Sequence, residues 1–136
     1  MAKINRDQNH LCTFCGVHSE TILHLLWECS KTKLFWRNLE TVINNRCLHA
    51  FNFKFTTNII IFGFCDQMRT DKVCEFIIYM AKFYIYRCKV QSICLNIKIF
   101  IKELYNRYVV EKIISKNSSD FRNNWGPYLK LFQSIL

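Results

Sequence analysis

The chain has 136 residues, a length that suits one domain with a modest core and is too short for two independent catalytic domains. Lysine and arginine number 19 against 10 aspartates and glutamates, so the formal net charge is +9, which favours polyanionic partners. Hydrophobic residues make up 51% of the chain, with only 3 glycines and 1 proline, which excludes a disordered chain and predicts long regular elements.

The N-terminal segment MAKINRDQNH has no apolar region and no small-residue cleavage site, so we do not expect secretion. The most apolar runs, NIIIFGFC (58–65) and FIIYMAKFYIY (76–86), are shorter than the roughly 20 residues that a membrane-spanning helix needs. We therefore expect an intracellular protein, in the nucleus or the cytoplasm, with no membrane partner. The 8 cysteines are interpreted as reduced or metal-bound.

The first motif along the chain combines three thiols and an imidazole: Cys12, Cys15, His24 and Cys29 have the spacing C-x2-C-x8-H-x4-C. Two thiolates separated by two residues can turn round one ion, and the later histidine and cysteine can close a tetrahedron. Gly16 supplies the tight turn after Cys15. The motif predicts one structural Zn²⁺, because four protein ligands leave no position for a catalytic water.

The same four side chains have an alternative explanation as unrelated residues, since free cysteine is common in protein cores. His18 is the nearest competing ligand, whereas His10 and His49 are expected at the surface or in the core. The remaining cysteines are interpreted as small apolar residues: Cys47, Cys65, Cys74, Cys88 and Cys94.

Two helices are predicted around the second half of the motif. Ser19 is the expected N-cap of a short helix that starts at Glu20 and ends just before Cys29. Ser30 is the expected N-cap of the next helix, which reaches Asn44. Apolar positions recur along that helix at helical spacing: Phe35, Leu39, Val42 and Ile43. Trp36 is expected to pack back on the segment from Cys12 to Cys29, called the knuckle here.

The rest of the chain predicts a connector, two long helices and a tail. FNFKF (51–55) alternates like a strand and IIIFGF is a short buried run, so the connector is expected to hold helical or extended turns. One long helix is expected from Thr70-Asp71 to about residue 90, and another over 95–115. The predicted class is mainly α, with a small Cys3His knuckle packed on about three to four helices. The predicted regions are 1–45 (knuckle and following helix), 46–69 (connector), 70–116 (two-helix basic module) and 117–136 (polar loop and C-terminal helical tail, which begins after Gly126-Pro127).

Each long helix is expected to bury one side. The predicted core positions are Val73, Ile77, Met80, Tyr84 and Cys88 on the first helix, and Ile97, Phe100, Ile101, Leu104 and Tyr108 on the second. Basic residues interleaved with tyrosines lie beside these stripes. They can hold phosphates while the rings stack on unpaired bases. A solvated lysine face whose tyrosines pack by their edges is the alternative.

The residues predicted to bind nucleic acid combine this strip with the cations that follow the metal motif. The latter also offset the negative charge of a site with three thiolates and one Zn²⁺. The full set is Lys31, Lys33, Arg37, Lys82, Tyr86, Arg87, Lys89, Lys98 and Lys102.

The segment LCTFCGVHSETILHLLWECSKTKLFW resembles the zinc-binding region that follows the reverse transcriptase of LINE-type non-LTR retrotransposons. The shared elements are Cys12 and Cys15, Glu20-Thr21, His24-Leu25, Trp27-Glu28-Cys29 and Phe35-Trp36. With a weaker likeness in IIIFGF and YMAKFYIYRCK, the similarity spans roughly residues 3–112. The resemblance implies a C-terminal piece of such an element, which would hold template RNA or target DNA near the polymerase.

The leading hypothesis is a non-catalytic zinc-binding module whose partners are RNA or single-stranded DNA, and the upstream reverse transcriptase where one polypeptide carries both. No enzyme activity is expected, because nothing in the sequence resembles the paired aspartates of a polymerase or the acidic and histidine set of the endonuclease. The second hypothesis is a structural zinc module for protein–protein contact, from a truncated element copy. A thiol enzyme that uses the C-x2-C pair is disfavoured, since no thioredoxin-like alternation of strands and helices surrounds the pair.

Overall fold

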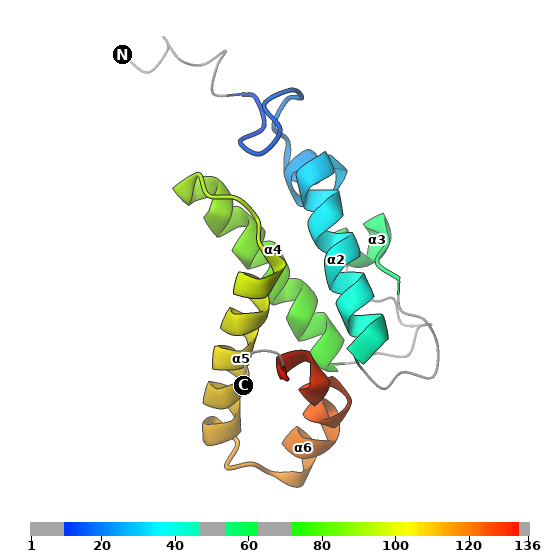
Figure 1. Ribbon diagram of the computed structural model, residues 1–136, viewed down its shortest axis with the longest axis vertical. Helices are drawn as coiled ribbons and strands as arrows, with labels where there is room; N and C mark the ends of the chain where they lie inside the picture. The colour runs from blue at the N-terminus through cyan, green and yellow to red at the C-terminus, as the bar shows by residue number, and fades with distance from the viewer. Residues whose placement is uncertain (1–9, 47–53, 63–71, 134–136) are drawn as a thin grey trace.

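Three long helices, α2 (Ser30–Arg46), α4 (Lys72–Gln91) and α5 (Ile97–Ile114), form the body of the protein (Figure 1). The computed structural model describes residues 10–46, 54–62 and 72–133. The three helices meet at a cluster of aromatic rings. The ring of Phe35 on α2 lies 5.6 Å from Tyr84 on α4 and 5.5 Å from Phe100 on α5. Edge and tilted ring contacts of this kind add to the burial of apolar area in the core.

The chain before α2 forms the knuckle loop and a π-helical turn, η2 (His24–Glu28). The Thr21 hydroxyl accepts a hydrogen bond from the backbone N–H of His24 at 3.0 Å, so Thr21 caps the helical residues that begin at Ile22 and continue into η2. The predicted cap at Ser19 is wrong, because Ser19 instead forms an antiparallel bridge with Leu11. That bridge holds the chain extended through Ser19, and the helical turn therefore begins later than Glu20.

Helix α2 follows the knuckle without a linker, since the N–H of Lys33 already bonds to the carbonyl of Cys29 at 2.8 Å. Its predicted apolar side is confirmed, with Phe35, Leu39 and Ile43 buried. The helix ends at Arg46, two residues beyond the predicted end. The predicted contact of a tryptophan with the knuckle is also confirmed. The indole Nε1 of Trp36 donates to the carbonyl of Leu26 at 2.7 Å.

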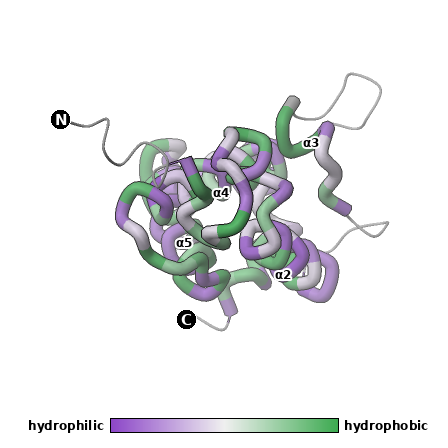
Figure 2. The backbone as a smooth tube through the Cα atoms, turned by 90° about the horizontal axis from the view of Figure 1, so that it is seen from above, coloured by the Kyte–Doolittle hydropathy of each residue, from purple (hydrophilic) through white to green (hydrophobic). Residues whose placement is uncertain are grey.

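Helix α3 (Thr57–Phe62) lies in the predicted connector and shows that residues 59–62 of the apolar run are helical. Ile59 and Ile60 are buried, and α3 contacts η2 while lying at the periphery of the fold in both views (Figure 1, Figure 2). Phe55 just before it is fully buried against the ring of Trp36 at 5.1 Å. The rest of the predicted strand-like segment, residues 51–53, lies outside the described residues.

Helices α4 and α5 match the two predicted long helices, although the expected start at Thr70-Asp71 lies outside the described residues. Asn96 caps α5, because its side-chain oxygen accepts the N–H groups of Lys98 and Ile99. The hydroxyl of Tyr84 accepts a hydrogen bond from the N–H of Asn96 at 3.0 Å and donates one to its carbonyl at 3.1 Å. These bonds connect the segment just before α5 to α4. The predicted core positions on α5 are buried at Phe100, Ile101 and Leu104.

The C-terminal region contains a helix that the sequence pattern did not predict, α6 (Ser119–Trp125). The segment was expected to be a polar loop, but Ser118 caps a helix by accepting the N–H of Phe121 at 3.2 Å. Phe121 and Trp125, one turn apart, pack on Tyr108 of α5 at 5.4 and 5.1 Å. Packing on α5 therefore overrides the weak helical pattern of this polar segment.

The predicted helical tail after Gly126-Pro127 is confirmed as a 3-10 helix, η3 (Gly126–Phe132). Tyr128, Leu131 and Phe132 are buried, and η3 contacts α2, α5 and α6. The tail thus completes the core of the long helices. Taken together, the described residues form a mainly α fold with a Cys3His loop at one end, as predicted (Figure 1). Among the described helices, none combines the length and the apolar character that crossing a membrane requires.

Candidate metal centre

The four predicted ligands come together at the end of the fold that carries the knuckle loop. Cys12 and Cys15 lie on the loop, His24 is the first residue of η2, and Cys29 lies between η2 and α2. Their ligand atoms all lie within 4.8 Å of one another. The Sγ atoms of Cys12 and Cys29 are 3.7 Å apart, and the Sγ of Cys15 is 3.5 Å from Nε2 of His24. The cluster can therefore hold one metal ion.

The separations of 3.7 and 3.5 Å match two edges of a tetrahedral zinc site. With Zn–S near 2.3 Å and Zn–N near 2.0–2.1 Å, tetrahedral angles place two sulfurs about 3.8 Å apart and a sulfur and a nitrogen about 3.6 Å apart. Three thiolates and one imidazole are also a donor set that suits Zn²⁺. Cys12, His24 and Cys29 are buried and Cys15 is half-buried, so the ligands enclose the position that an ion would take.

The loop that carries Cys12 and Cys15 is shaped by its own backbone. Gly16 has φ of +67°, a conformation that L side chains rarely adopt, and its N–H bonds to the carbonyl of Cys12 at 2.8 Å. The backbone N–H groups of Val17 and His18 donate to the Sγ of Cys15. The backbone N–H groups of Phe14 and Cys15 donate to the Sγ of Cys12. The turn therefore directs backbone donors at both sulfurs, as a pair of thiolate ligands requires.

The two loop cysteines differ in acidity. Hydrogen bonds from the backbone N–H groups of His18 and Val17 lower the pKa of Cys15 to about 6. Burial raises the pKa of Cys12 to about 11, in spite of the N–H groups that it accepts. The thiolate form of Cys15 is thus available near neutral pH, whereas Cys12 requires the charge of a bound cation to release its proton.

Several residues that the sequence reasoning did not assign to the metal site hold it together. The carboxylate of Glu20 accepts the N–H and the hydroxyl of Thr13 at 2.8 and 2.9 Å, and pairs with the ammonium of Lys89 at 3.0 Å. Burial alone would raise the pKa of Glu20, but these partners outweigh it and the pKa is lowered. The buried hydroxyl of Thr32 donates to the carbonyl of Leu25 at 2.7 Å. The pair Glu20-Thr21 before His24 was visible in the sequence, but the ion pair of Glu20 with Lys89 on α4 was not.

The other histidines and cysteines divide as follows. His18 is exposed and its ring lies 5.3 Å from that of His24, so it adjoins the cluster without belonging to it. Cys74 and Cys88 are buried, which fits their interpretation as small apolar residues, and burial raises the pKa of Cys88. Cys94, which was also interpreted as a small apolar residue, is exposed. His10, which was expected at the surface or in the core, is exposed. The predictions for Cys47, His49 and Cys65 fall outside the described residues.

Four of the cations predicted to bind nucleic acid have partners within the protein. Arg37 pairs with Glu40 at 2.9 Å, and Arg87 pairs with Glu103 of α5. Lys82 donates to the carbonyl of Ile60 on α3 at 2.8 Å, and Lys89 pairs with Glu20 of the knuckle, as described above. The predicted strip along α4 and α5 is therefore divided. Lys82 and Lys89 face α3 and the knuckle, whereas Arg87 faces α5, because the helix turns by about 100° per residue.

The remaining predicted residues are more accessible. Lys31 and Lys33 on α2 and Lys98 and Lys102 on α5 are exposed, and none of the ion pairs formed by the described part of the chain involves them. Tyr86 is also exposed, and the ammonium of Lys89 lies 5.7 Å from the centre of its ring.

No protein-family model, curated protein or solved structure matches this chain. The resemblance to the region that follows a retrotransposon reverse transcriptase therefore stays a prediction that rests on the motif residues of the sequence.

Proposed function

We propose that this chain is a non-catalytic module that binds one structural Zn²⁺ and uses the helices organised by that ion to bind nucleic acid. A structural role is supported by the ligand count. Cys12, Cys15, His24 and Cys29 supply all four positions of a tetrahedron, which leaves none for a water or a substrate. The ion would join the loop, η2 and the start of α2, because the four ligands lie on or directly beside these three segments.

Elemental analysis of the purified protein is expected to find one zinc ion per chain. The double variant Cys12→Ser and Cys29→Ser should lose the ion and the order of residues 12–29, because metal affinity in a small site is largely folding free energy. Cys94→Ser is the matched control: it removes an exposed thiol outside the cluster and should keep the ion. Full zinc retention in the double variant would contradict the assignment of the ligands.

The proposal of nucleic-acid binding rests on the four exposed lysines, Lys31, Lys33, Lys98 and Lys102, which no carboxylate of the described residues neutralises. In a chain with a net charge of +9, such lysines are available to phosphates. The resemblance of the motif to a region thought to hold template RNA or target DNA supports the same partner. Non-catalytic binding of RNA or single-stranded DNA is therefore the function proposed.

The proposal predicts binding of a single-stranded RNA or DNA oligonucleotide that weakens steeply with salt, measured by fluorescence anisotropy at several salt concentrations. Each neutralised phosphate contributes about 0.7 to the log–log slope on a single strand. The double variant Lys31→Gln and Lys33→Gln should therefore lower the slope by about 1.4, and Lys98→Gln with Lys102→Gln by a similar amount.

Lys112→Gln with Lys116→Gln is the control, since both lysines are exposed near the other end of α5 and the charge change is the same. These substitutions should change the slope little. Equal losses in all three double variants would indicate unspecific attraction by net charge. An unchanged slope in the first two, with circular dichroism showing folded protein, would remove the four lysines from any nucleic-acid site.

A further inference from the structure

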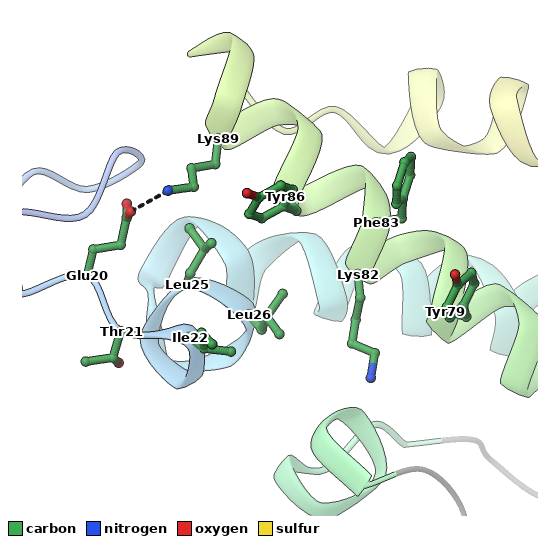
Figure 3. Close-up of a pocket in the computed structure, with 10 residues that line it drawn as sticks. All are labelled: Glu20, Thr21, Ile22, Leu25, Leu26, Tyr79, Lys82, Phe83, Tyr86 and Lys89. Carbon is green, nitrogen blue, oxygen red and sulfur yellow. Dashed lines mark ion pairs between the residues drawn. The ribbon is translucent and has the colours of Figure 1, made fainter.

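A groove of about 530 Å³ lies between η2 and one side of α4 (Figure 3). Its walls are apolar: Ile22, Leu25 and Leu26 on the side of η2, and Tyr79, Phe83 and Tyr86 on α4. The four outermost of these side chains are largely exposed, at 76% for Ile22, 66% for Tyr79, 57% for Phe83 and 56% for Tyr86. Large apolar side chains gathered at an open groove are typical of a binding surface.

The wall formed by η2 is held in place by the candidate metal centre. His24, one of the ligands, directly precedes Leu25 and Leu26 in the chain. The carbonyls of these two leucines accept hydrogen bonds from Thr32 and Trp36 of α2, both at 2.7 Å. The groove is therefore a preorganised surface, which lowers the entropy that a partner must lose on binding.

Of the cations that line the groove, one has no carboxylate partner among residues 10–46, 54–62 and 72–133. At one end Glu20 and Lys89 neutralise each other at 3.0 Å, as the dashed line in Figure 3 marks. Lys82 lies between Tyr79 and Tyr86 along α4, and within the described ranges its ammonium donates to the neutral carbonyl of Ile60 and pairs with no carboxylate. The groove thus carries a net positive charge within a protein whose own net charge is +9, which favours an acidic occupant.

The spacing of the apolar residues fits a helix. Tyr79, Phe83 and Tyr86 are separated by four and three residues, and so form a stripe about 10 Å long on α4. An amphipathic helix presents apolar side chains with the same spacing on its own face. A nucleic acid fits less well, because aliphatic side chains form one wall and the carboxylate of Glu20 lines the groove.

We propose that the groove between η2 and α4 binds the apolar face of an acidic amphipathic helix from a partner protein. The apolar side chains of that helix lie between Ile22 and the rings of α4, and its carboxylates face Lys82. This binding is separate from the proposed contact with nucleic acid, which rests on lysines outside the groove.

The test uses the zinc-loaded full chain and three fluorescein-labelled synthetic peptides of about 18 residues. One peptide has leucines at helical i, i+4, i+7 and i+11 positions on a background of glutamate and alanine. The second has the same composition with the leucine stripe scrambled, and the third has lysine in place of glutamate. Anisotropy should show saturable binding of the first peptide, with affinities about tenfold or more lower for the other two.

Two double variants separate the groove from apolar surface in general. Tyr79→Ser with Phe83→Ser should weaken binding of the first peptide about tenfold or more. Ile99→Ser with Ile113→Ser is the matched control, because it removes two exposed apolar side chains of α5 outside the groove and should leave the affinity unchanged. If the groove variant does not fold, Ile22→Ser supplies the same test from the opposite wall, where the side chain is 76% exposed.

Equal binding of all three peptides, or equal losses in the groove and control variants, would overturn the proposal. Displacement of the bound peptide by a single-stranded oligonucleotide that itself loses affinity in the groove variant would assign the groove to nucleic acid. Dimerisation of the wild type that the groove variant abolishes would assign it to a second copy of the chain. Loss of oligonucleotide binding in the lysine variants, with peptide binding intact, is the result expected if both proposals hold.

Discussion

Glu20 shows how a single side chain connects the knuckle with the helices. Its carboxylate accepts two hydrogen bonds from Thr13 of the loop and pairs with Lys89 near the end of α4. These contacts favour the charged form and lower the pKa of Glu20, although burial acts in the opposite direction. The stabilisation is therefore present above the pKa of glutamate in the unfolded chain, and is lost as the pH falls through the lower pKa of the folded state.

We accordingly predict that Glu20→Gln lowers the unfolding temperature at pH 7 and that the difference from wild type shrinks as the pH falls below about 4. Thermal melts from pH 3 to pH 8 with excess zinc would measure this difference. Glu75→Gln is the control, since Glu75 is exposed and forms none of the ion pairs found in the described part of the chain. A difference that stays constant across the pH range would show that the charge of Glu20 has no stabilising role.

Capping side chains set where the helices α5 and α6 begin. Asn96 and Ser118 each have an extended backbone, and their side chains accept hydrogen bonds from N–H groups of the turn that follows. The helices α5 and α6 therefore start directly after these two residues. Asn96 has a second role, because its backbone bonds to the hydroxyl of Tyr84 on α4. Burial raises the pKa of that hydroxyl to about 12, so it remains a neutral donor and acceptor at physiological pH.

Replacing Asn96 by alanine is predicted to destabilise the protein by about 1 kcal/mol, because two N–H groups of α5 lose their acceptor. Urea unfolding with excess zinc should show a lower midpoint and an unchanged slope. Asn106→Ala, at an exposed position within the same helix, should be neutral or slightly stabilising, since alanine is the better helix former. Equal effects of the two substitutions would argue against the cap.

At the scale of the whole molecule, the candidate metal centre lies at one end of a core that has its own apolar contacts. Helices α2, α4 and α5 and the η3 tail bury large side chains away from the ligands, among them Leu39, Ile77, Leu104 and Leu131. The loop of residues 12–23 has mainly backbone turns, the Glu20 contacts and the ligands themselves to order it. Stability is therefore expected to differ between the two ends.

Chelation of the metal is predicted to act locally first. Amide hydrogen exchange should accelerate in residues 12–29 after treatment with a chelator, while the centres of α4 and α5 keep most of their protection. Adding zinc back should restore the original pattern. Acceleration spread evenly over α2, α4 and α5 would indicate that the ion supports the whole fold. No acceleration in residues 12–29 would indicate that the ion does not stabilise this segment.

The long helices and the ligand set were determined by the sequence alone. Both depend on short-range spacing: α2, α4 and α5 have apolar residues at helical periods, and Cys12, Cys15, His24 and Cys29 have the intervals of a four-ligand site. The helix α6 could not be predicted this way, because its seven residues are mostly polar and its two rings acquire a reason to share a face only when Tyr108 lies beneath them.

Only the tertiary structure decided which charges are available. Lys82, Arg87 and Lys89 are close in sequence, yet their partners Ile60, Glu103 and Glu20 are 16 to 69 residues away along the chain and lie on three different elements. A periodicity says which side of a helix a cation occupies, but not which carbonyl or carboxylate the fold brings to it. The same holds for the groove beside η2, whose two walls are separate in the sequence. They face each other because Thr32 and Trp36 bond the turn to α2, and the turn also packs on α4.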